Sequence, residues 1–302
     1  MDAPLLSRRD WLSRSSAALA VAALGVPRRI ESAITPEELI LHSRGGYRFL
    51  PGVPFLSFGV LAADGFEIGR TTFRQPRPFP AGMADIEKLL QASGRPIQAL
   101  CGLELRSPRP LIPAEFNAFN QANIARLKQA GLLMGDQVPL TRTNVALART
   151  SMASGEPEVS IHAFSYTMPT ARRERAEAPT FVTAGMPEIR NLQSAALRRE
   201  APDIVARNDT TSAGLPTPAA LRLKTEFILT ALDETMRALG VRWTDVTGVQ
   251  LYTVHDLQPL VADLILPHIG AAARLGIEWH HTYPPGVQVE LGVRGTHVEL
   301  TA

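Results

Sequence analysis

The chain has 302 residues, of which 45% are hydrophobic and 20% are charged; this composition is typical of a globular protein and excludes a disordered one. The formal net charge is only +2, so the composition gives no reason to expect a nucleic-acid partner. The single cysteine, Cys101, excludes an internal disulfide and a cysteine-cluster metal site. Because Cys101 lies in an apolar segment, we expect a buried structural thiol rather than a nucleophile.

Residues 1–30 carry the pattern of a targeting segment. The run Ser7–Leu12 (SRRDWL) resembles the twin-arginine export signature, and the apolar run Ala17–Gly25 follows it. That run is shorter than the roughly 20 residues a membrane span needs, but it suits the hydrophobic part of a signal. We therefore predict export to the periplasm by the twin-arginine route, with no stable membrane span after processing. A chance basic start and a retained membrane anchor are the alternatives.

Residues 35–170 are predicted to form the first of two domains. Short strands at Leu39–His42 and Pro54–Leu61 come first, and the second ends in the turn signal Ala63-Asp64-Gly65. The remaining elements are predicted as a strand at Phe66–Phe73, a proline-rich connector at Arg74–Gly82, a helix at Ala84–Ala92 before Gly94, a strand at Leu100–Leu105, a helix at Ala114–Ala130, and strands at Thr143–Ala148 and Val159–Thr167.

Residues 178–302 are predicted to form the second domain, after a charged joint at Ala171–Pro179. A polar insertion, roughly Arg190–Thr217, has little periodicity and is interpreted as a surface loop, with a lid as the alternative. The remaining elements are predicted as a strand at Thr180–Ala184, a helix from Pro218 to about Leu239, a strand at Val246–Thr253, a helix at Leu257–Arg274, and strands at Ile277–Tyr283 and Val287–Val293.

The two halves share an order of elements and a short sequence match. When Gly94 is placed over Gly240, IQALCGLEL (Ile97–Leu105) lies over WTDVTGVQL (Trp243–Leu251). This match predicts an internal duplication in which each half has the order ββ-α-β-α-ββ. We therefore predict an α+β protein with the helices covering one sheet face.

Five short segments carry a family resemblance: CGLELRSP, FNAFN, TRTNV, FSYT and the tail WHHTYPPGVQVELGVRG. Together they resemble the Rid (reactive-intermediate deaminase) family, and most of all its long tandem members related to 2-aminomuconate deaminases. The resemblance covers most of the chain from about Thr35 onward. It implies two tandem chorismate-mutase-like (Rid-type) ββαβαββ domains, a trimer-type homo-oligomer and sites in clefts between neighbouring domains. It also implies hydrolysis of enamine or imine carboxylic acids with release of ammonia, without a metal or organic cofactor.

The resemblance assigns carboxylate binding to Arg142, in TRTNV, and matches Asn120, in FNAFN, to an asparagine that the family keeps on its second helix; Asn144 lies in the same motif as Arg142. A guanidinium suits this role because it is planar, permanently charged and able to bind a carboxylate through two nitrogens. Arg106, at the end of the preceding strand, is a second cationic candidate. The alternatives are a surface salt bridge for Arg142 and a pairing with Glu104 for Arg106.

The general acid or base departs from the family pattern. The family often places a glutamate on the last strand to hold the attacking water. In the first half Ser160 or His162 stands there. In the second half Glu290 is in place, but the arginine position has become the neighbourhood of Tyr283. Because neither half holds the whole pair, we predict one composite site that takes its arginine from Arg142 and its carboxyl group from Glu290.

Other kinds of site lack their patterns. His280 and His281 are adjacent, so on a strand they point to opposite faces, and no H-E-x-x-H spacing, phosphate-binding glycine loop or G-x-S-x-G motif is present. We therefore expect no metal and no cofactor. The sequence favours a deaminase of small enamine or imine acids, with a non-catalytic binder of small carboxylates and a chorismatase-like enzyme as the alternatives.

Overall fold

The computed structural model describes residues 38–109, 111, 113–147, 159–170, 178–190, 211–284 and 287–302. The signal segment at residues 1–30, the charged joint at residues 171–177 and most of the polar insertion, residues 191–210, lie outside the described residues. No helix within the described ranges is long and apolar enough to cross a membrane.

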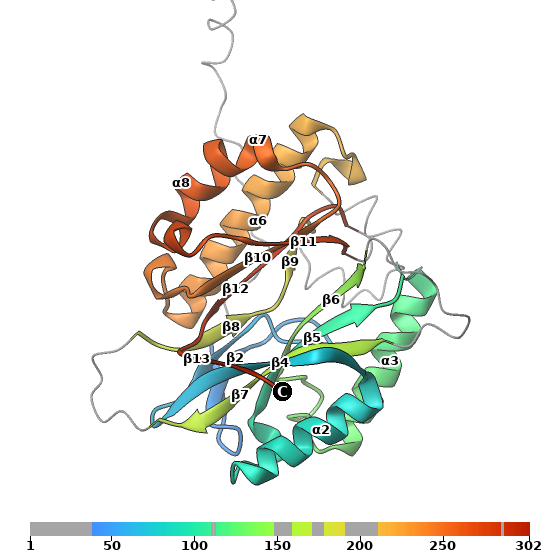
Figure 1. Ribbon diagram of the computed structural model, residues 1–302, viewed down its shortest axis with the longest axis vertical. Helices are drawn as coiled ribbons and strands as arrows, with labels where there is room; N and C mark the ends of the chain where they lie inside the picture. Colours follow the sequence, from blue (N-terminus) through green and yellow to red (C-terminus); the bar gives the residue numbers. More distant parts are fainter. Residues whose placement is uncertain are drawn as a thin grey trace, which may run out of the picture. The chain divides into compact units, whose positions relative to one another are not determined.

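The first half of the chain forms a strand-rich unit with two helices packed on it (Figure 1). Its elements are β1 (Ile40–His42), β2 (Tyr47–Leu50), β3 (Gly59–Ala62), β4 (Phe66–Pro78), α2 (Phe79–Ala92), β5 (Leu100–Ser107), α3 (Pro113–Gln129), β6 (Thr141–Leu147) and β7 (Ser160–Pro169). β4 runs through most of the predicted connector. Its pairing with β7 is interrupted by a bulge between Thr72 and Arg77, and such a bulge accommodates Pro76, which has no N–H for the ladder.

The second half contains one long helix and a broken one. Its elements are β8 (Phe181–Thr183), β9 (Met186–Pro187), α6 (Pro218–Leu239), β10 (Gly248–Thr253), α7 (Gln258–Leu260), a π-helical turn η4 (Val261–Ile265), α8 (Leu266–Ile269), a 3-10 turn η5 (Gly270–Leu275), β11 (Glu278–Tyr283), β12 (Glu290–Gly295) and β13 (Val298–Thr301). The side chain of Thr217 caps α6 by accepting a hydrogen bond from Ala220 N, 3.3 Å away. The helix predicted at Leu257–Arg274 is present but irregular, because α7, η4, α8 and η5 follow one another from Gln258 to Leu275 with different helical hydrogen-bonding patterns. Pro267 has no N–H for a helical hydrogen bond, and Gly270 adopts a positive φ of 52°.

The strands pair in the order β1-β2-β3-β8-β12-β10-β11-β6-β5-β7-β4-β13, with β9 beside β12. Within the first half, β5 pairs in parallel with β6 and antiparallel with β7. Within the second half, β10 pairs in parallel with β11 and antiparallel with β12. β11 joins the two groups, because its last two residues pair with Ala146 and Leu147 of β6.

The predicted fold, two tandem chorismate-mutase-like (Rid-type) ββαβαββ domains with helices on one sheet face, is wrong. The predicted strands Pro54–Leu61 and Phe66–Phe73 would pair with each other in such a domain, whereas β3 pairs with β2 and with β8 of the other half, and β4 pairs with β7. The last strand of the chain, β13, pairs with β4 of the first half. The halves therefore exchange strands in a mixed α/β structure, and the predicted domains at residues 35–170 and 178–302 do not have separate sheets.

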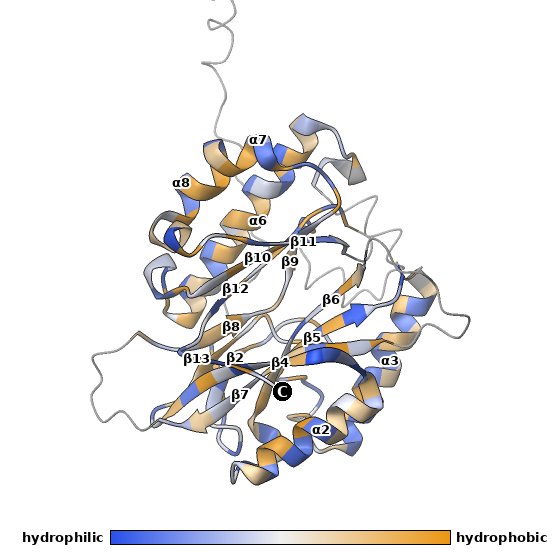
Figure 2. Ribbon diagram, viewed as in Figure 1, coloured by the Kyte–Doolittle hydropathy of each residue, from blue (hydrophilic) through white to orange (hydrophobic). Residues whose placement is uncertain are grey.

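Helices cover two groups of strands. α2 contacts β4 and β7, whereas α6 contacts β3, β9 and β12, and Figure 1 shows α2 and α3 on one side of the strands and α6, α7 and α8 on the other. Two apolar cores result, one with Ile86 and Leu103 and the other with Ile228 and Leu251. Hydrophobic and hydrophilic positions alternate along the helices of both layers, as expected of amphipathic helices (Figure 2). Cys101 is fully buried, which confirms the expectation of a structural thiol.

Candidate functional site

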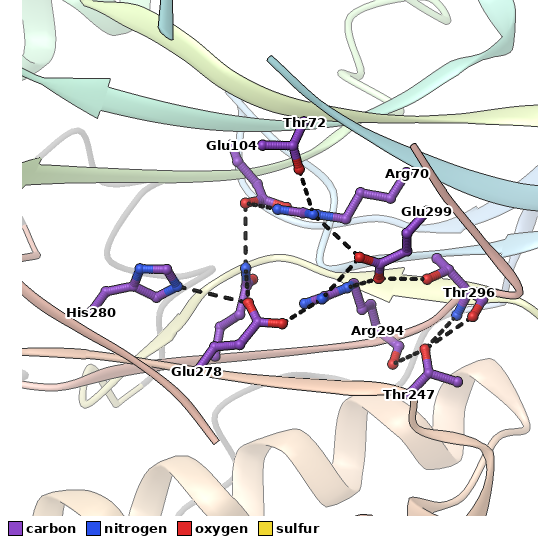
Figure 3. A network of polar contacts seen from close by, with 10 residues as sticks. Arg70, Thr72, Glu104, Thr247, Glu278, His280, Arg294, Thr296 and Glu299 are labelled. Carbon is purple, nitrogen blue, oxygen red and sulfur yellow. Dashed lines mark hydrogen bonds and ion pairs between the residues drawn. The ribbon is translucent and has the colours of Figure 1, made fainter. Parts of the chain in front are cut away.

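The faces of β5 and β10 that point away from the helices meet in a polar network (Figure 3). Arg70 on β4 binds the Glu104 carboxylate through two nitrogens, at 2.6 and 2.9 Å. Gln250 on β10 donates to Glu104 at 3.3 Å and to Glu278 at 3.2 Å. Arg294 on β12 binds the same Glu278 at 2.5 Å. We call Arg70, Glu104, Gln250, Glu278, Arg294 and Glu299 the Glu104 network; it connects the two halves.

The Glu104 network is electrostatically satisfied. Burial alone would raise the pKa of Glu104, but hydrogen bonds from Arg70 and the charge of Arg70 lower it to about 2. Glu299 completes the cluster by accepting from Arg294 at 2.7 Å. Glu104 therefore stays ionised and paired with Arg70, and the predicted alternative, a pairing of Arg106 with Glu104, does not occur among the described hydrogen bonds. This network is structural in character.

Arg142 lies on β6, and its side chain points toward α3, on the face of the strand opposite to the Glu104 network. Its Nη2 donates to Asn120 Oδ1 at 2.6 Å, and its guanidinium carbon lies 5.1 Å from the ring centre of Phe55 and 5.5 Å from that of Phe119. Burial lowers the pKa of Arg142 to about 10, although the charge of Glu290 opposes this change. Arg142 is 5% exposed, so it is not a surface salt bridge. It remains charged at neutral pH, held between two aromatic rings and an amide.

Glu290, the first residue of β12, pairs with Tyr252 of β10 and with Pro187 of β9. The carboxyl group fits because residue 185 is glycine: any side chain there would overlap it. Burial, and then the charge of Glu188, raises the pKa of Glu290 from its ordinary value of 4.5 to about 8, whereas Arg142 and then Arg106 oppose the rise. No hydrogen bond joins this carboxyl group to another described residue, which leaves it available to a ligand.

Arg106, near the end of β5, also acts electrostatically on Glu290 and favours its ionisation. Its Nη1 donates to the carbonyl oxygen of Leu105 at 3.0 Å, and its guanidinium carbon lies 5.9 Å from the ring centre of Tyr252. The Tyr252 ring stacks on His280, with 4.8 Å between ring centres. Glu290 thus shares its surroundings with two buried arginines, Arg106 from one strand and Arg142 from the next.

Ser160 and His162, the first-half candidates for the acid or base, lie on β7, next to Arg106 of β5. Ser160 Oγ donates to the carbonyl oxygen of Arg106 at 3.3 Å. Burial, and then the charge of Arg106, lowers the pKa of His162 to about 4, so this imidazole is neutral at pH 7. Of the three candidates for the acid or base, Ser160 has a hydroxyl held by a backbone carbonyl and His162 has a neutral imidazole. Glu290 is the candidate whose pKa is shifted toward neutrality.

Asn144 and Tyr283 complete the predicted set. Asn144 Oδ1 accepts from Ser107 Oγ at 2.9 Å. The backbone of Tyr283 pairs with Ala146 of β6, which brings β11 to the same end of β6, but its side chain lies outside the described part of the structure. The predicted residues therefore come from α3 and from strands of both halves: Arg142 lies near the start of β6, Arg106 near the end of β5, and Ser160 and Glu290 at the starts of β7 and β12.

Several buried polar atoms around Glu290 have no hydrogen-bond partner among the described residues. Those that can donate are Arg106 Nη2, Arg142 Nη1 and Asn144 Nδ2. Leaving a buried donor unpaired costs about 1–3 kcal/mol, and more when the donor is charged. A group of unpaired donors that includes two cations is therefore suited to an anionic ligand that supplies several acceptor oxygens.

Three residues at this site were missed from the sequence: Tyr252, Glu188 and Lys224. The only available signal concerned Lys224. In α6 it occupies a position in line with Leu221 and Ile228 on the buried stripe, where a charged residue is unexpected unless it has a partner. Tyr252 and Glu188 lie in an apolar strand and a short loop, and nothing in their local pattern separates them from ordinary core and surface residues.

Comparison with known proteins gives matches of three kinds. A family model described as 2-aminomuconate deaminase CnbZ matches residues 39–300. The chain is 34% identical over 261 residues to the 2-amino-5-chloromuconate deaminase of Comamonas testosteroni, and the alignment covers 85% of this chain and 96% of that protein. Among solved structures, a chorismatase matches with a TM-score of 0.41 and 14% sequence identity, over 86% of this chain and 80% of the chorismatase.

Proposed function

The chain belongs to the 2-aminomuconate deaminase family CnbZ, and from this premise we propose that it hydrolyses 2-aminomuconate or a close analogue and releases ammonia. One observation supports this proposal above the others. Glu290, a carboxyl group with a raised pKa, interacts electrostatically with both Arg142 and Arg106. Each of these arginines keeps one buried nitrogen that has no partner among the described residues.

The two arginines suit the two ends of the substrate. A muconate carries one carboxylate at each end of a six-carbon chain, so binding it requires two separate cationic groups. In this proposal Arg142, held by Asn120, takes one carboxylate, and Arg106 takes the other. Asn144 Nδ2 supplies a further hydrogen bond, which satisfies a donor that is otherwise unpaired.

Glu290 then acts first as an acid and afterwards as a base. At neutral pH its carboxyl group is largely protonated, so it can donate a proton to a substrate carbon conjugated with the amino-bearing carbon. The nitrogen lone pair forms the C=N bond of an iminium ion as the C=C bond takes up that proton. The Glu290 carboxylate next accepts a proton from a water whose oxygen attacks the C=N carbon. Collapse of the resulting carbinolamine breaks the C–N bond, and ammonia leaves as the carbonyl group forms.

The test is ammonia release by the purified protein, measured with 2-aminomuconate and with imines derived from monocarboxylic amino acids. We expect fast release from 2-aminomuconate and slow release from the monocarboxylates, because only the dicarboxylate engages both arginines. Tight binding of 2-aminomuconate without ammonia release would contradict the proposal and support a non-catalytic carboxylate binder instead.

We also propose that the protein is exported by the twin-arginine route, on the strength of the Ser7–Leu12 and Ala17–Gly25 runs. The double substitution Arg8→Lys and Arg9→Lys should leave unprocessed protein in the cytoplasm, as measured by fractionation and immunoblotting. A matched variant with Arg28→Lys and Arg29→Lys, outside the signature, should be exported normally. Normal export of the Arg8/Arg9 variant would refute the route. A trimer-type homo-oligomer and an internal duplication remain predictions.

A further inference from the structure

A buried ion pair that the proposed chemistry does not use lies next to Glu290. Glu188 follows β9, Lys224 lies on α6, and both side chains are 0% exposed. Lys224 Nζ lies 3.2 Å from Glu188 Oε1 and donates to the carbonyl oxygen of Thr211 at 2.7 Å. A pair this deeply buried gives a weak net contribution to stability, because both charges have lost their hydration. Its position therefore calls for a different explanation from stability alone.

Glu188 also holds the start of β12. Its Oε1 accepts from the backbone N–H of Gln288 at 2.7 Å, and its Oε2 accepts from that of Val289 at 3.0 Å. These are the two amides that directly precede Glu290. One lysine and two N–H groups thus bind the Glu188 carboxyl group, and the contacts with the two N–H groups fix the backbone from which the Glu290 side chain projects.

Lys224 pairs with the carboxyl group of Glu188 and not with that of Glu290. The charged and titratable groups around Glu290 are Glu188 after β9, Arg142 on β6, Arg106 on β5 and Tyr252 on β10. Further away, the His255 ring contacts the side chain of Gln288. Glu188 is the anion among these neighbours, and it opposes ionisation of Glu290, whereas the two arginines favour it. A dianionic ligand that engages both arginines would remove their influence and leave that of Glu188.

We propose that Glu188 and Lys224 form a positioning pair that fixes the start of β12 and keeps the Glu290 carboxyl group protonated until the substrate has bound. The raised pKa of Glu290 has the sign that this arrangement requires. This inference deepens the proposed function. It rests on that function for the catalytic use of the Glu290 proton. The protonation itself is a property of the free protein and is measurable without any substrate.

The experiment is a pH titration of carboxyl-labelled glutamates by ¹³C NMR, in which the signal that is absent from Glu290→Gln identifies Glu290. In the double variant Glu188→Gln/Lys224→Met, which removes both charges of the pair together, the pKa of Glu290 should fall, but by less than the roughly one to three units that removal of one close negative charge produces. The single variant Glu188→Gln should move it in the same direction. Glu299→Gln, which removes a carboxylate of the Glu104 network instead, should leave it unchanged.

The same variants separate this inference from the proposed function. If the pKa of Glu290 is the same in the wild type and in the folded double variant, the pair does not control Glu290 and the inference is overturned. If that pKa falls and the alkaline limb of kcat/KM for 2-aminomuconate moves to lower pH with it, both proposals are supported. If the pKa falls while the pH profile stays in place, the pair still controls Glu290, but Glu290 is not the working acid of the proposed function.

Discussion

Replacing Glu290 by glutamine is expected to lower kcat for ammonia release by about 100- to 10,000-fold, the range that positioned proton transfer supplies. Glutamine keeps the shape of the side chain and its hydrogen-bonding atoms, so it fits the space beside Gly185, but it can neither donate the carboxyl proton nor accept one from water. Because the arginines remain, the KM should change little. Steady-state kinetics with 2-aminomuconate measure both constants.

Ser160 and His162 provide the comparison for this prediction. Ser160→Ala and His162→Gln should retain most of the activity, because the hydroxyl of Ser160 is bonded to the Arg106 carbonyl and the His162 imidazole is already neutral at pH 7. If turnover survives in Glu290→Gln and is lost in one of these two variants, the acid or base has been misassigned.

Replacing Arg142 by alanine is expected to weaken binding of a dicarboxylate roughly 10- to 150-fold, since a charge-assisted contact is worth about 1.5–3 kcal/mol. Arg106→Ala should have an effect of similar size, because its guanidinium also keeps an unpaired nitrogen and also acts electrostatically on Glu290. Calorimetry with muconate, which has both carboxylates and no amino group to lose, measures binding alone.

Two further variants make the arginine result interpretable. Arg142→Lys keeps the charge and loses the planar fork that also binds Asn120, so its affinity should fall between those of the wild type and Arg142→Ala. Arg77→Ala, which removes a half-exposed arginine paired with Asp85, should bind muconate as the wild type does. Unchanged affinity in both Arg106→Ala and Arg142→Ala would mean that the carboxylates bind elsewhere.

Local signals in the sequence were sufficient for many elements and insufficient for the topology. Pro218 and Gly240 bound α6 correctly, because a helix start and stop are set by residues next to them. The pairing of β3 with β8 and of β13 with β4 joins residues more than a hundred positions apart, and strand periodicity says which face is buried but not which strand lies alongside. The prediction of a tandem Rid-type fold failed at that step.

The candidate site shows a similar division. Arg142 and Glu290 were singled out from motifs, and the structure places them, from different halves of the chain, near enough to interact electrostatically. Their roles remain proposals. The sequence could not reveal that Glu290 is accompanied by a second buried carboxylate, because Glu188 is brought to it by the pairing of β9 with β12. Protonation depends on such neighbours, so a motif identifies a carboxyl group more readily than its charge state.

The central claim is that one ligand extends from Arg106 to Arg142 past Glu290. The most direct test compares kcat/KM for 2-aminomuconate with that for 2-aminopenta-2,4-dienoate, the analogue that lacks the distal carboxylate, in the wild type, Arg106→Ala and Arg142→Ala. The wild type should prefer the dicarboxylate roughly 10- to 150-fold. One arginine variant should lose that preference, whereas the other should lower kcat/KM for both substrates alike. A preference that is unchanged in both variants would contradict the claim.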